Sequence, residues 1–585
     1  MMRAATFAIL FFLCMSPFYS QSKAGASAQL RKLIDEEWET RMREFPEGAT
    51  LLGDNRYNHR VADWSPEAIE RRRKYSQGLL GRVEAIHRSR LAEGDRIHYD
   101  LFLNRLRLDV AGDAFPQHWM PLNQMEGIQT QLATLAALTP FRAARDYEDY
   151  LARLRAVPKL VEQTTALMRE GIKQGYTLPR IVLRTVPAQI QALVDEDPAR
   201  TVFYAPFRKI APQVTPSERL RFEQDGRRAI AEHVLPAFRK FADFFSREYL
   251  PAARTDVSIR ALPRGDALYA YLVRLHTTTD WTAQRIHEIG MEEVGRIRAR
   301  MEEVIRQAAF QGDFNAFVAF LRTDPRFYYK TAEELLTGYR DICKRTDPEL
   351  VRLFGVLPRT TYGVIAVPDN EAPSTTTAYY REPAMGGLRP GYFYANTYKL
   401  ESRPKYEMEA LALHESVPGH HLQIALAQEL EGLPNFRRYG SVTAFVEGWG
   451  LYAESLGEEM GFYRDPYSKF GQLTYEMWRA CRLVVDTGMH ALGWDRQRAI
   501  DFMKDNTAKA EHDIVVEIDR YIAWPGQALA YKIGELRIKE LRLRAASQLG
   551  DRFDLRKFHD VVLGSGAVPL DVLEKNVNKY IVDGK

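Results

Sequence analysis

Three histidines and a glutamate lie within one short, otherwise apolar stretch of the sequence, between His414 and His421. Imidazole nitrogen is a common zinc ligand, and zinc lowers the pKa of a bound water molecule towards ~7. Glu415 directly follows the first histidine, so its carboxylate can take the proton from that water as a general base. The stretch therefore predicts a site for one Zn²⁺ ion, with His414 as a ligand and Glu415 as the catalytic base.

The competing interpretation is that these histidines only pack or form hydrogen bonds, as isolated histidines often do. Their clustering argues against it, because three of the 13 histidines in the chain fall within eight residues. The adjacent glutamate strengthens the argument, since it supplies the second group that hydrolytic zinc chemistry needs.

The second histidine ligand is not decided by spacing alone. His414 and His420 are six residues apart, which on a regular helix of about 100° per residue separates them by roughly 120°. Pro418 and Gly419 lie between them and favour a bulge of about two residues that resets the helical phase. An unbroken helix would instead pair His414 with His421, which is nearly in phase. We expect His420 to be the ligand and keep His421 as the alternative.

A second apolar, helix-like stretch, residues 443–454, carries Glu447 and Glu454. A buried carboxylate is unfavourable unless it is paired or bound to a metal. Glu447 lies 27 residues after His420, which suits a third ligand arriving on a second helix. Glu454 lies seven residues further along the same face, where it either orients a ligand or forms an ordinary ion pair.

Two groups further along the chain are candidates for binding substrate. Arg482, Asp486 and His490 are spaced by four residues and share one helix face, where they either orient ligands or substrate or form surface ion pairs. Residues 517–532 then bring together two tyrosines that can donate hydrogen bonds to an oxyanion and two cations that can hold a carboxylate. The candidates in this second stretch are Tyr521, Tyr531, Arg520, Lys532 and Gln527.

A small sheet is expected just before the histidine stretch, between about residues 353 and 399. Residues 364–367, 376–380 and 392–395 have the composition of short strands, and the glycine-rich residues 386–391 predict a turn between the last two. In zinc peptidases an exposed edge strand can pair with an extended peptide. Tyr379 and Tyr380 are therefore candidates for substrate contact, and a purely structural hairpin is the alternative.

The N-terminus predicts export. Arg3, the apolar run from Ala4 to Met15 and the small residues 24–26 describe a signal peptide over residues 1–26. The mature protein would be periplasmic or secreted. Cys14 suggests lipid anchoring instead, but the large residues before it disfavour that alternative. No other run approaches the ~20 apolar residues of a transmembrane helix.

The rest of the composition describes an ordinary globular protein. The formal net charge is +4, or about +2 without Arg3 and Lys23, and no basic block points to nucleic acid. Helical periodicity recurs throughout, and 585 residues favour more than one lobe. We expect an N-terminal helical lobe over 27–260 and a catalytic lobe over 261–585.

Several motifs together resemble a bacterial family catalogued as domain of unknown function 885. The motif around His414 is the most specific of them, and the resemblance covers most of the mature chain. The matching segments are Leu275–Asp280, His414–Gln423, Phe445–Glu454, Val485–His490 and Arg520–Lys532.

That family is similar, more distantly, to the helical zinc peptidases of the thimet oligopeptidase and neurolysin type, which are gluzincins. The resemblance implies His414, His420 and Glu447 as ligands and Glu415 as the base. It also implies Tyr531, with Tyr521 next, as the tyrosine that stabilises the oxyanion. The fold implied is a mainly α-helical, two-lobed body with a deep channel that admits oligopeptides. Two extra residues between the histidines depart from the pattern of those peptidases.

These features predict an exported zinc metallopeptidase that hydrolyses oligopeptides. One alternative is a catalytically inactive, metal-containing binding or structural protein of the cell envelope. The altered histidine spacing favours this alternative. Another is a zinc hydrolase of non-peptide amides or esters. The sequence does not indicate an oligomeric state.

Overall fold

The computed structural model describes residues 23–369 and 371–584. Most of the predicted signal peptide, with Cys14, lies outside these residues. Residues 23–26, at its end, belong to the first turn of helix α1 (Lys23–Glu44). None of the described helices is long and apolar enough to cross a membrane.

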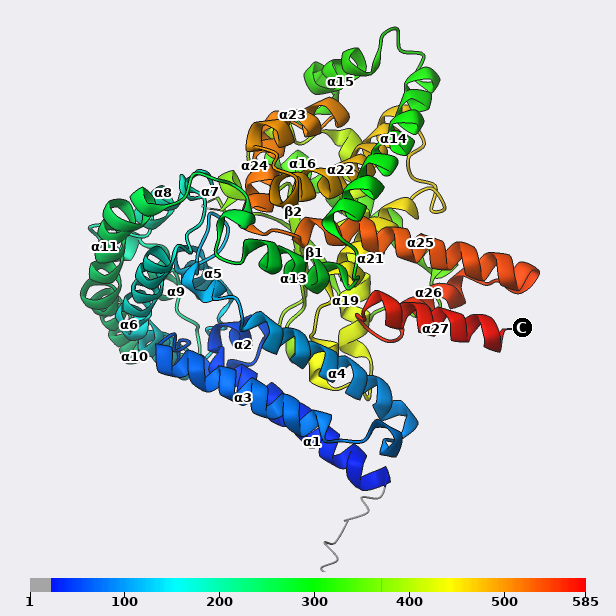
Figure 1. Ribbon diagram of the computed structural model, residues 1–585. Coiled ribbons are helices and arrows are strands. Elements are labelled where there is room, and N and C mark those ends of the chain that lie inside the picture. The colour runs from blue at the N-terminus through cyan, green and yellow to red at the C-terminus, as the bar shows by residue number, and fades with distance from the viewer. Residues whose placement is uncertain (1–22, 370, 585) are drawn as a thin grey trace, which may run out of the picture.

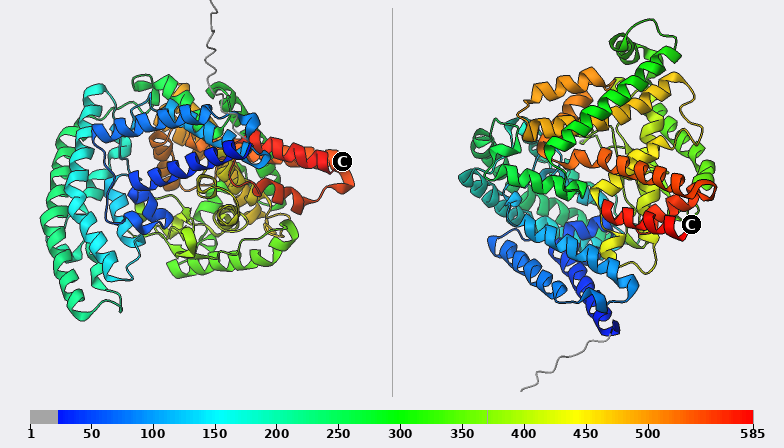
Figure 2. Two further views of the ribbon diagram at one scale, coloured as in Figure 1. Left: turned by 90° about the horizontal axis from the view of Figure 1, so that it is seen from below. Right: turned by 45° about the vertical axis from the view of Figure 1, so that its right-hand side comes forward.

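The described chain is mainly helical, as expected, and Figure 1 shows how the helices are arranged. The longer helices before residue 260 lie along the lower and left sides of the view in Figure 1, and the later ones fill the remainder, as the views of Figure 2 also show. The earlier group is α1, α3 (Pro66–Glu84), α4 (Glu93–Gly112), α5 (Ile128–Leu138), α6 (Ala144–Gln174), α10 (Pro216–Ala229) and α11 (Leu235–Phe244). The later group is α13 (Gly265–Thr277), α14 (Ala283–Gln307), α15 (Phe314–Thr323), α16 (Ala332–Thr346), α18 (Met408–Glu415), α19 (His420–Glu429), α21 (Thr443–Ser455), α22 (Pro466–Ala491), α23 (Arg496–Asn506), α24 (Glu511–Ala523), α25 (Ala530–Leu549), α26 (Leu555–Leu563) and α27 (Leu570–Asp583).

The core extends through both groups of helices. One cluster of buried apolar side chains runs from Ala26 to Ile581, so the earlier and later helices bury their apolar faces against each other. The division into two lobes at residue 260 stays a prediction.

The expected small sheet is present and contains three strands. They are β1 (Tyr362–Ala366), β2 (Ala378–Arg381) and β3 (Gly391–Ala395), in the spatial order β1-β3-β2. β1 is parallel to β3 and β2 is antiparallel to it, so the predicted turn between β2 and β3 is confirmed. β2 is therefore an edge strand, and it packs against α18, the helix that carries His414.

Helices α21 and α25 approach unusually closely, because glycines face each other at their crossing. A β-carbon on Gly448 would lie 2.5 Å from the Cα of Gly534. This crossing brings Glu447 on α21 near Tyr531 on α25, so the glycine contact helps to set the geometry of the site described below.

We predict that Gly448→Ala lowers the free energy of unfolding by about 1–3 kcal/mol, the usual penalty of overpacking. Gly295→Ala on α14 is the matched control, because a β-carbon there meets no atom within 4 Å. The control should be neutral or stabilising by up to about 1 kcal/mol, since alanine favours helix more than glycine does. Chemical denaturation of both variants measures the difference. Equal stabilities would contradict the proposed role of the contact.

Candidate metal centre

His414 and His420 are brought together by a break between two helices. α18 ends at Glu415 and α19 begins at His420, so the chain forms two helices here and not one helix with a bulge. Pro418 has no N–H to continue α18. Gly419 passes so close to the end of α18 that a β-carbon would lie 1.9 Å from the His414 carbonyl oxygen. The indole N–H of Trp449 donates to the Pro418 carbonyl at 2.8 Å, which ties the break to α21.

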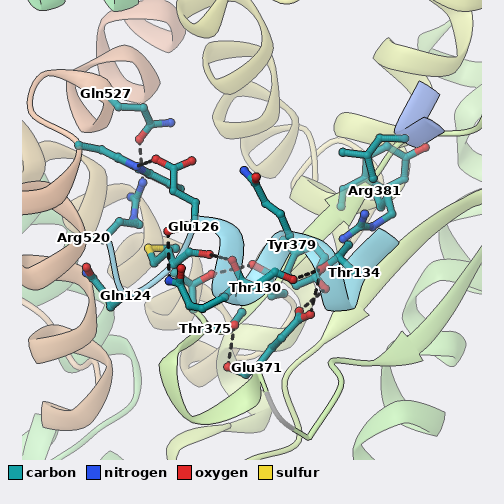
Figure 3. A pocket seen from close by; sticks show the side chains of 18 of the residues that line it. Gln124, Glu126, Thr130, Thr134, Glu371, Thr375, Tyr379, Arg381, Arg520 and Gln527 are labelled. Carbon is teal, nitrogen blue, oxygen red and sulfur yellow. Dashed lines mark hydrogen bonds between the residues drawn. The ribbon is translucent and has the colours of Figure 1, made fainter. Parts of the chain in front are cut away.

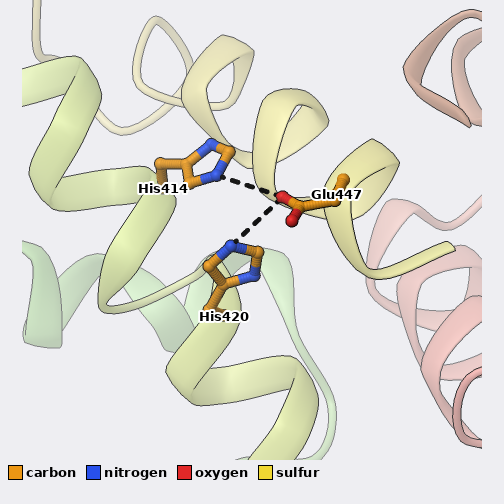
Figure 4. Close-up of side chains that lie close together, drawn as sticks. All are labelled: His414, His420 and Glu447. Atoms are coloured by element: carbon orange, nitrogen blue, oxygen red, sulfur yellow. Dashed lines mark ion pairs between the residues drawn. The ribbon is translucent and has the colours of Figure 1, made fainter. Parts of the chain in front are cut away.

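The break places both histidines beside Glu447, as Figure 4 shows. Glu447 Oε2 lies 3.7 Å from His414 Nε2 and 3.5 Å from His420 Nε2. Ligands bound tetrahedrally to zinc at ~2.1 Å are separated from one another by roughly 3.4 Å. The observed separations therefore fit one ion between the three atoms. Glu447 Oε2 is also buried and accepts no hydrogen bond within the described chain. Buried polar atoms normally have a partner, and a metal ion would supply one here.

The orientation of the His414 ring is set by a second carboxylate. His414 Nδ1–H donates to Glu454 Oε1 at 2.8 Å, and Arg479 pairs with the same oxygen at 3.1 Å. This arrangement leaves the Nε2 lone pair directed at the ligand cluster. Gly450 permits the packing of the ring, because a β-carbon there would lie 2.7 Å from His414 Cε1. Glu454 thus contacts a candidate ligand and also forms an ion pair with Arg479, the two arrangements that its spacing allowed.

The buried charges of the cluster shift one another's protonation. Burial alone would lower the pKa of His414, but the neighbouring carboxylates of Glu447 and Glu454 outweigh it and raise that pKa to about 9. Burial likewise opposes ionisation of Glu447, yet the two neighbouring histidines bring its pKa well below the ordinary value. A divalent cation would replace the protons that now balance Glu447.

His421, the alternative ligand, points elsewhere. Its Nδ1 accepts from the Tyr380 hydroxyl at 2.8 Å, and its Nε2–H donates to the Thr360 carbonyl at 2.9 Å. Both nitrogens are therefore occupied by residues in or next to the sheet. The group able to hold a metal ion consists of His414, His420 and Glu447.

A cavity of about 840 Å³ opens onto this group. Glu415 and Tyr531 both line the cavity, and the Tyr531 ring stacks beside His414 with 6.2 Å between ring centroids. Burial raises the pKa of Glu415, although the two histidines partly oppose that shift. The other predicted residues that line the cavity are Arg482, Arg520, Gln527, Tyr379 and Tyr380.

The second candidate tyrosine lies behind the cavity wall. The Tyr521 hydroxyl is fully buried and accepts from Trp478 Nε1–H and Arg482 Nε–H, each at 2.8 Å. Since its oxygen is engaged and it does not line the cavity, the geometry favours Tyr531 over Tyr521 for contact with substrate.

Asp486, His490 and Lys532 also lie away from the cavity. Asp486 accepts from the Tyr269 hydroxyl at 2.6 Å and from the Gly526 N–H at 3.1 Å. His490 Nε2–H donates to the Tyr521 carbonyl, and its Nδ1 accepts from a backbone N–H in the segment before α13. Lys532 is buried among three carboxylates, those of Glu293, Glu476 and Glu535. These contacts join helices to one another.

The chain before residue 260 supplies a wall of the cavity that the sequence did not indicate. Figure 3 shows part of this wall together with residues of the sheet and of the C-terminal helices. Two hydrogen bonds connect it to α24 and the following turn: Gln124 donates to the Asp519 carbonyl, and Trp524 donates to Glu126. Only the three-dimensional arrangement identifies this wall, whose polar residues include Gln124, Glu126, Gln129, Thr130 and Gln189.

Residues 46–577 match the family described as "Bacterial protein of unknown function (DUF885)". The chain belongs to this family. Among curated proteins, none matches this DUF885 protein.

Solved structures share the fold of this DUF885 protein over nearly their whole length. The crystal structure of a "putative lipoprotein" from Colwellia psychrerythraea is 29% identical, with a TM-score of 0.90 over 95% of this chain and 99% of that chain. A "putative lipoprotein of unknown function" from Shewanella oneidensis is 17% identical, with a TM-score of 0.69 over the same shares, and shows the fold alone.

We predict that the purified DUF885 protein binds about one zinc ion per chain, that His420→Ala loses it, and that His421→Ala retains it. The reason is that His420 directs a nitrogen at Glu447, whereas both nitrogens of His421 are engaged by Tyr380 and Thr360. Elemental analysis after dialysis against a buffer that contains zinc measures the zinc content of the wild type and of both variants. Loss of metal from His421→Ala with retention in His420→Ala would exclude the ligand set proposed here.

We also predict a pH dependence of stability that originates at Asp486. Burial raises the pKa of this carboxyl from near 3.8 to about 7, against the hydrogen bonds from Tyr269 and Gly526. The folded state therefore holds the proton more tightly than the unfolded state. Its stabilising contribution is complete below about pH 4 and is lost as the pH rises through about 7.

The stability of Asp486→Asn relative to the wild type should accordingly be higher at pH 8 than at pH 5, growing by roughly 1.4 kcal/mol for each pH unit up to about pH 7. Chemical denaturation at both pH values tests this. The exposed Asp280→Asn variant is the control and should follow the wild type. Parallel curves for Asp486→Asn and the wild type would refute the assignment.

Proposed function

We propose that this DUF885 protein is an exported zinc metallopeptidase that hydrolyses oligopeptides. The observation that carries the proposal is the convergence of His414, His420 and Glu447 beside a buried carboxylate, Glu415, at the wall of a cavity. Export is supported by the predicted signal peptide and by the similarity to proteins described as lipoproteins.

The donor set suits zinc, because two imidazole nitrogens and one carboxylate leave a coordination position open for water or substrate. A zinc ion held there supplies Lewis acidity, which acidifies water and polarises a carbonyl group. Glu454 and Arg479 hold the His414 ring in place. The helix break at Pro418 and Gly419 positions His420.

Glu415 is the proposed general base. Its carboxyl group is buried beside the histidine pair, and burial raises its pKa towards the range in which a base both accepts and releases a proton. In this role it takes a proton from the attacking water and passes it to the leaving amine. Tyr531 also lines the cavity, with its ring beside that of His414, and we assign its hydroxyl to the developing oxyanion.

The edge strand β2 is suited to hold the substrate backbone. β2 pairs with β3 on one side only, and its residues Tyr379, Tyr380 and Arg381 line the cavity. An extended peptide can add to such an edge through main-chain hydrogen bonds, which are independent of sequence. This arrangement favours peptides over esters and small amides as substrates.

We predict that Glu415→Gln keeps bound zinc but reduces peptide hydrolysis by on the order of 10²–10⁴-fold, the usual contribution of a general base. Glutamine preserves the shape of the side chain and removes its ability to accept a proton. Cleavage of a fluorogenic oligopeptide library, with metal content measured in parallel, tests both statements.

Glu409→Gln is the matched control, because Glu409 lies on the same helix but accepts the Tyr463 N–H away from the cavity. This variant should retain activity. Undiminished hydrolysis by Glu415→Gln would exclude its role as the base. Zinc-loaded wild-type protein that cleaves amides or esters but no peptide would move the assignment to the non-peptide alternative.

A further inference from the structure

Resting on the proposed peptidase function, we propose that the cavity recognises the free C-terminal carboxylate of a peptide, so that the enzyme removes short fragments from the C-terminus. The recognition group is a buried pair of arginines, Arg482 and Arg520, at the cavity wall formed by α22 and α24.

The two arginines share a single carboxylate partner, so their direct pairing leaves one positive charge over at this wall. Both are buried, with 3% and 4% of their surface exposed, and both line the cavity. Their only carboxylate partner within the described residues is Glu517, whose Oε2 accepts from Arg482 Nη2 and Arg520 Nη2, each at 3.1 Å. Arg479, also at the cavity, is already paired with Glu454. A buried excess charge is unfavourable unless a counter-ion arrives.

The hydrogen-bonding capacity at this wall is also incomplete. Arg482 Nη1 is buried and has no acceptor within the described chain. Gln527 accepts from Arg520 Nη1 at 2.7 Å through its Oε1, and its NH₂ group, which contacts Tyr531, has a second N–H as a further donor at the cavity. Figure 3 shows Arg520 and Gln527 in contact on one side of the cavity. Unused guanidinium and amide donors match the two oxygens of a carboxylate.

The position of Arg482 relative to the metal ligands limits the length of peptide between them. The guanidinium carbon of Arg482 lies 4.2 Å from the centre of the Tyr531 ring, and that ring stacks beside His414. The Tyr531 ring therefore contacts both the guanidinium and the His414 ring, so the two lie no more than the sum of these distances apart. Since an extended residue spans about 3.3–3.6 Å, this separation accommodates about one to three residues beyond the scissile bond.

Aromatic rings enclose the guanidinium of Arg482. Its carbon also lies 4.4 Å from the centre of a Trp478 ring and 5.5 Å from that of Tyr521. Because the rings of Trp478 and Tyr521 lie against the guanidinium, we assign this wall to the end of the bound peptide and the carboxylate held there to its terminus. The side-chain carboxylate of a final Asp or Glu shares the same chemistry, and the experiment must distinguish the two.

The test compares three otherwise identical N-acetylated hexapeptide libraries: free acids, C-terminal amides, and amides that end in Glu. We expect kcat/KM for the acids to exceed that for the simple amides by at least about 10-fold, with products that are one to three residues long at the C-terminal end. In Arg482→Gln, kcat/KM for the acids should exceed that for the simple amides by no more than about 2-fold. Calorimetry with the zinc-loaded Glu415→Gln variant should show the same preference in binding, independently of turnover.

Two variants control for location and folding. Arg381→Gln removes a cation that Figure 3 shows on the other side of the cavity, and it should preserve the ratio of acid to amide. Arg437→Gln removes a buried arginine outside the cavity and should leave both rates unchanged. The wild-type comparison needs no variant, so a misfolded Arg482→Gln would still leave the proposal testable.

Equal cleavage and binding of acids and amides would overturn this inference while leaving the peptidase function intact. Cleavage of the Glu-ending amides at the rate of the acids would overturn the terminal assignment. Loss of the preference in Arg381→Gln, with retention in Arg482→Gln, would overturn the location. Failure to bind or cleave any library would overturn the proposed function itself, and the inference with it.

Discussion

The site depends on one buried electrostatic chain, which runs from His414 through Glu454 to Arg479. Glu454 is fully buried, so its carboxylate requires partners inside the protein. Those partners come from α18 and α22, while Glu454 itself lies on α21. The same contacts that compensate the charge therefore lock three helices together and hold a ligand histidine in one orientation. Stability and function are coupled here through a single carboxylate.

Close backbone packing is the second requirement. Gly419 lets α19 begin directly against the end of α18, Gly450 leaves room for the His414 ring, and Gly448 with Gly534 lets α21 and α25 cross at short range. A β-carbon at any of these positions would lie within 2.7 Å of an atom of a neighbouring segment, so the helices would have to shift. The site consequently depends on three close helix contacts, each of which requires glycine because a larger side chain would not fit.

The cavity has two electrostatic regions with Tyr531 between them. On one side lie two histidines and the carboxylates of Glu447 and Glu415, where a cation is favoured. On the other lie Arg482 and Arg520 with an unbalanced positive charge, where an anion is favoured. A substrate with a negative charge at one end, such as a peptide with a free C-terminal carboxylate, matches the charges of the two regions.

The sequence by itself determined the residue types that can do chemistry, the mainly helical fold and the three strands. It did so because liganding side chains in an apolar run, helical periodicity and turn-forming glycines are local signals. Glu447 was also predictable as a third candidate ligand, because a carboxylate in an apolar helix needs an ion pair or a metal. The family motifs pointed to the same residues.

Only the tertiary structure decided which of several equivalent candidates face the cavity. His421 is engaged by Tyr380 and Thr360, and Tyr521 by Trp478 and Arg482, so His420 and Tyr531 remain at the site. The sequence did not indicate that residues before 260 form a wall of the cavity. The physical reason is the same in each case: the direction of a side chain is set by partners distant in the chain, and spacing along one helix does not contain them.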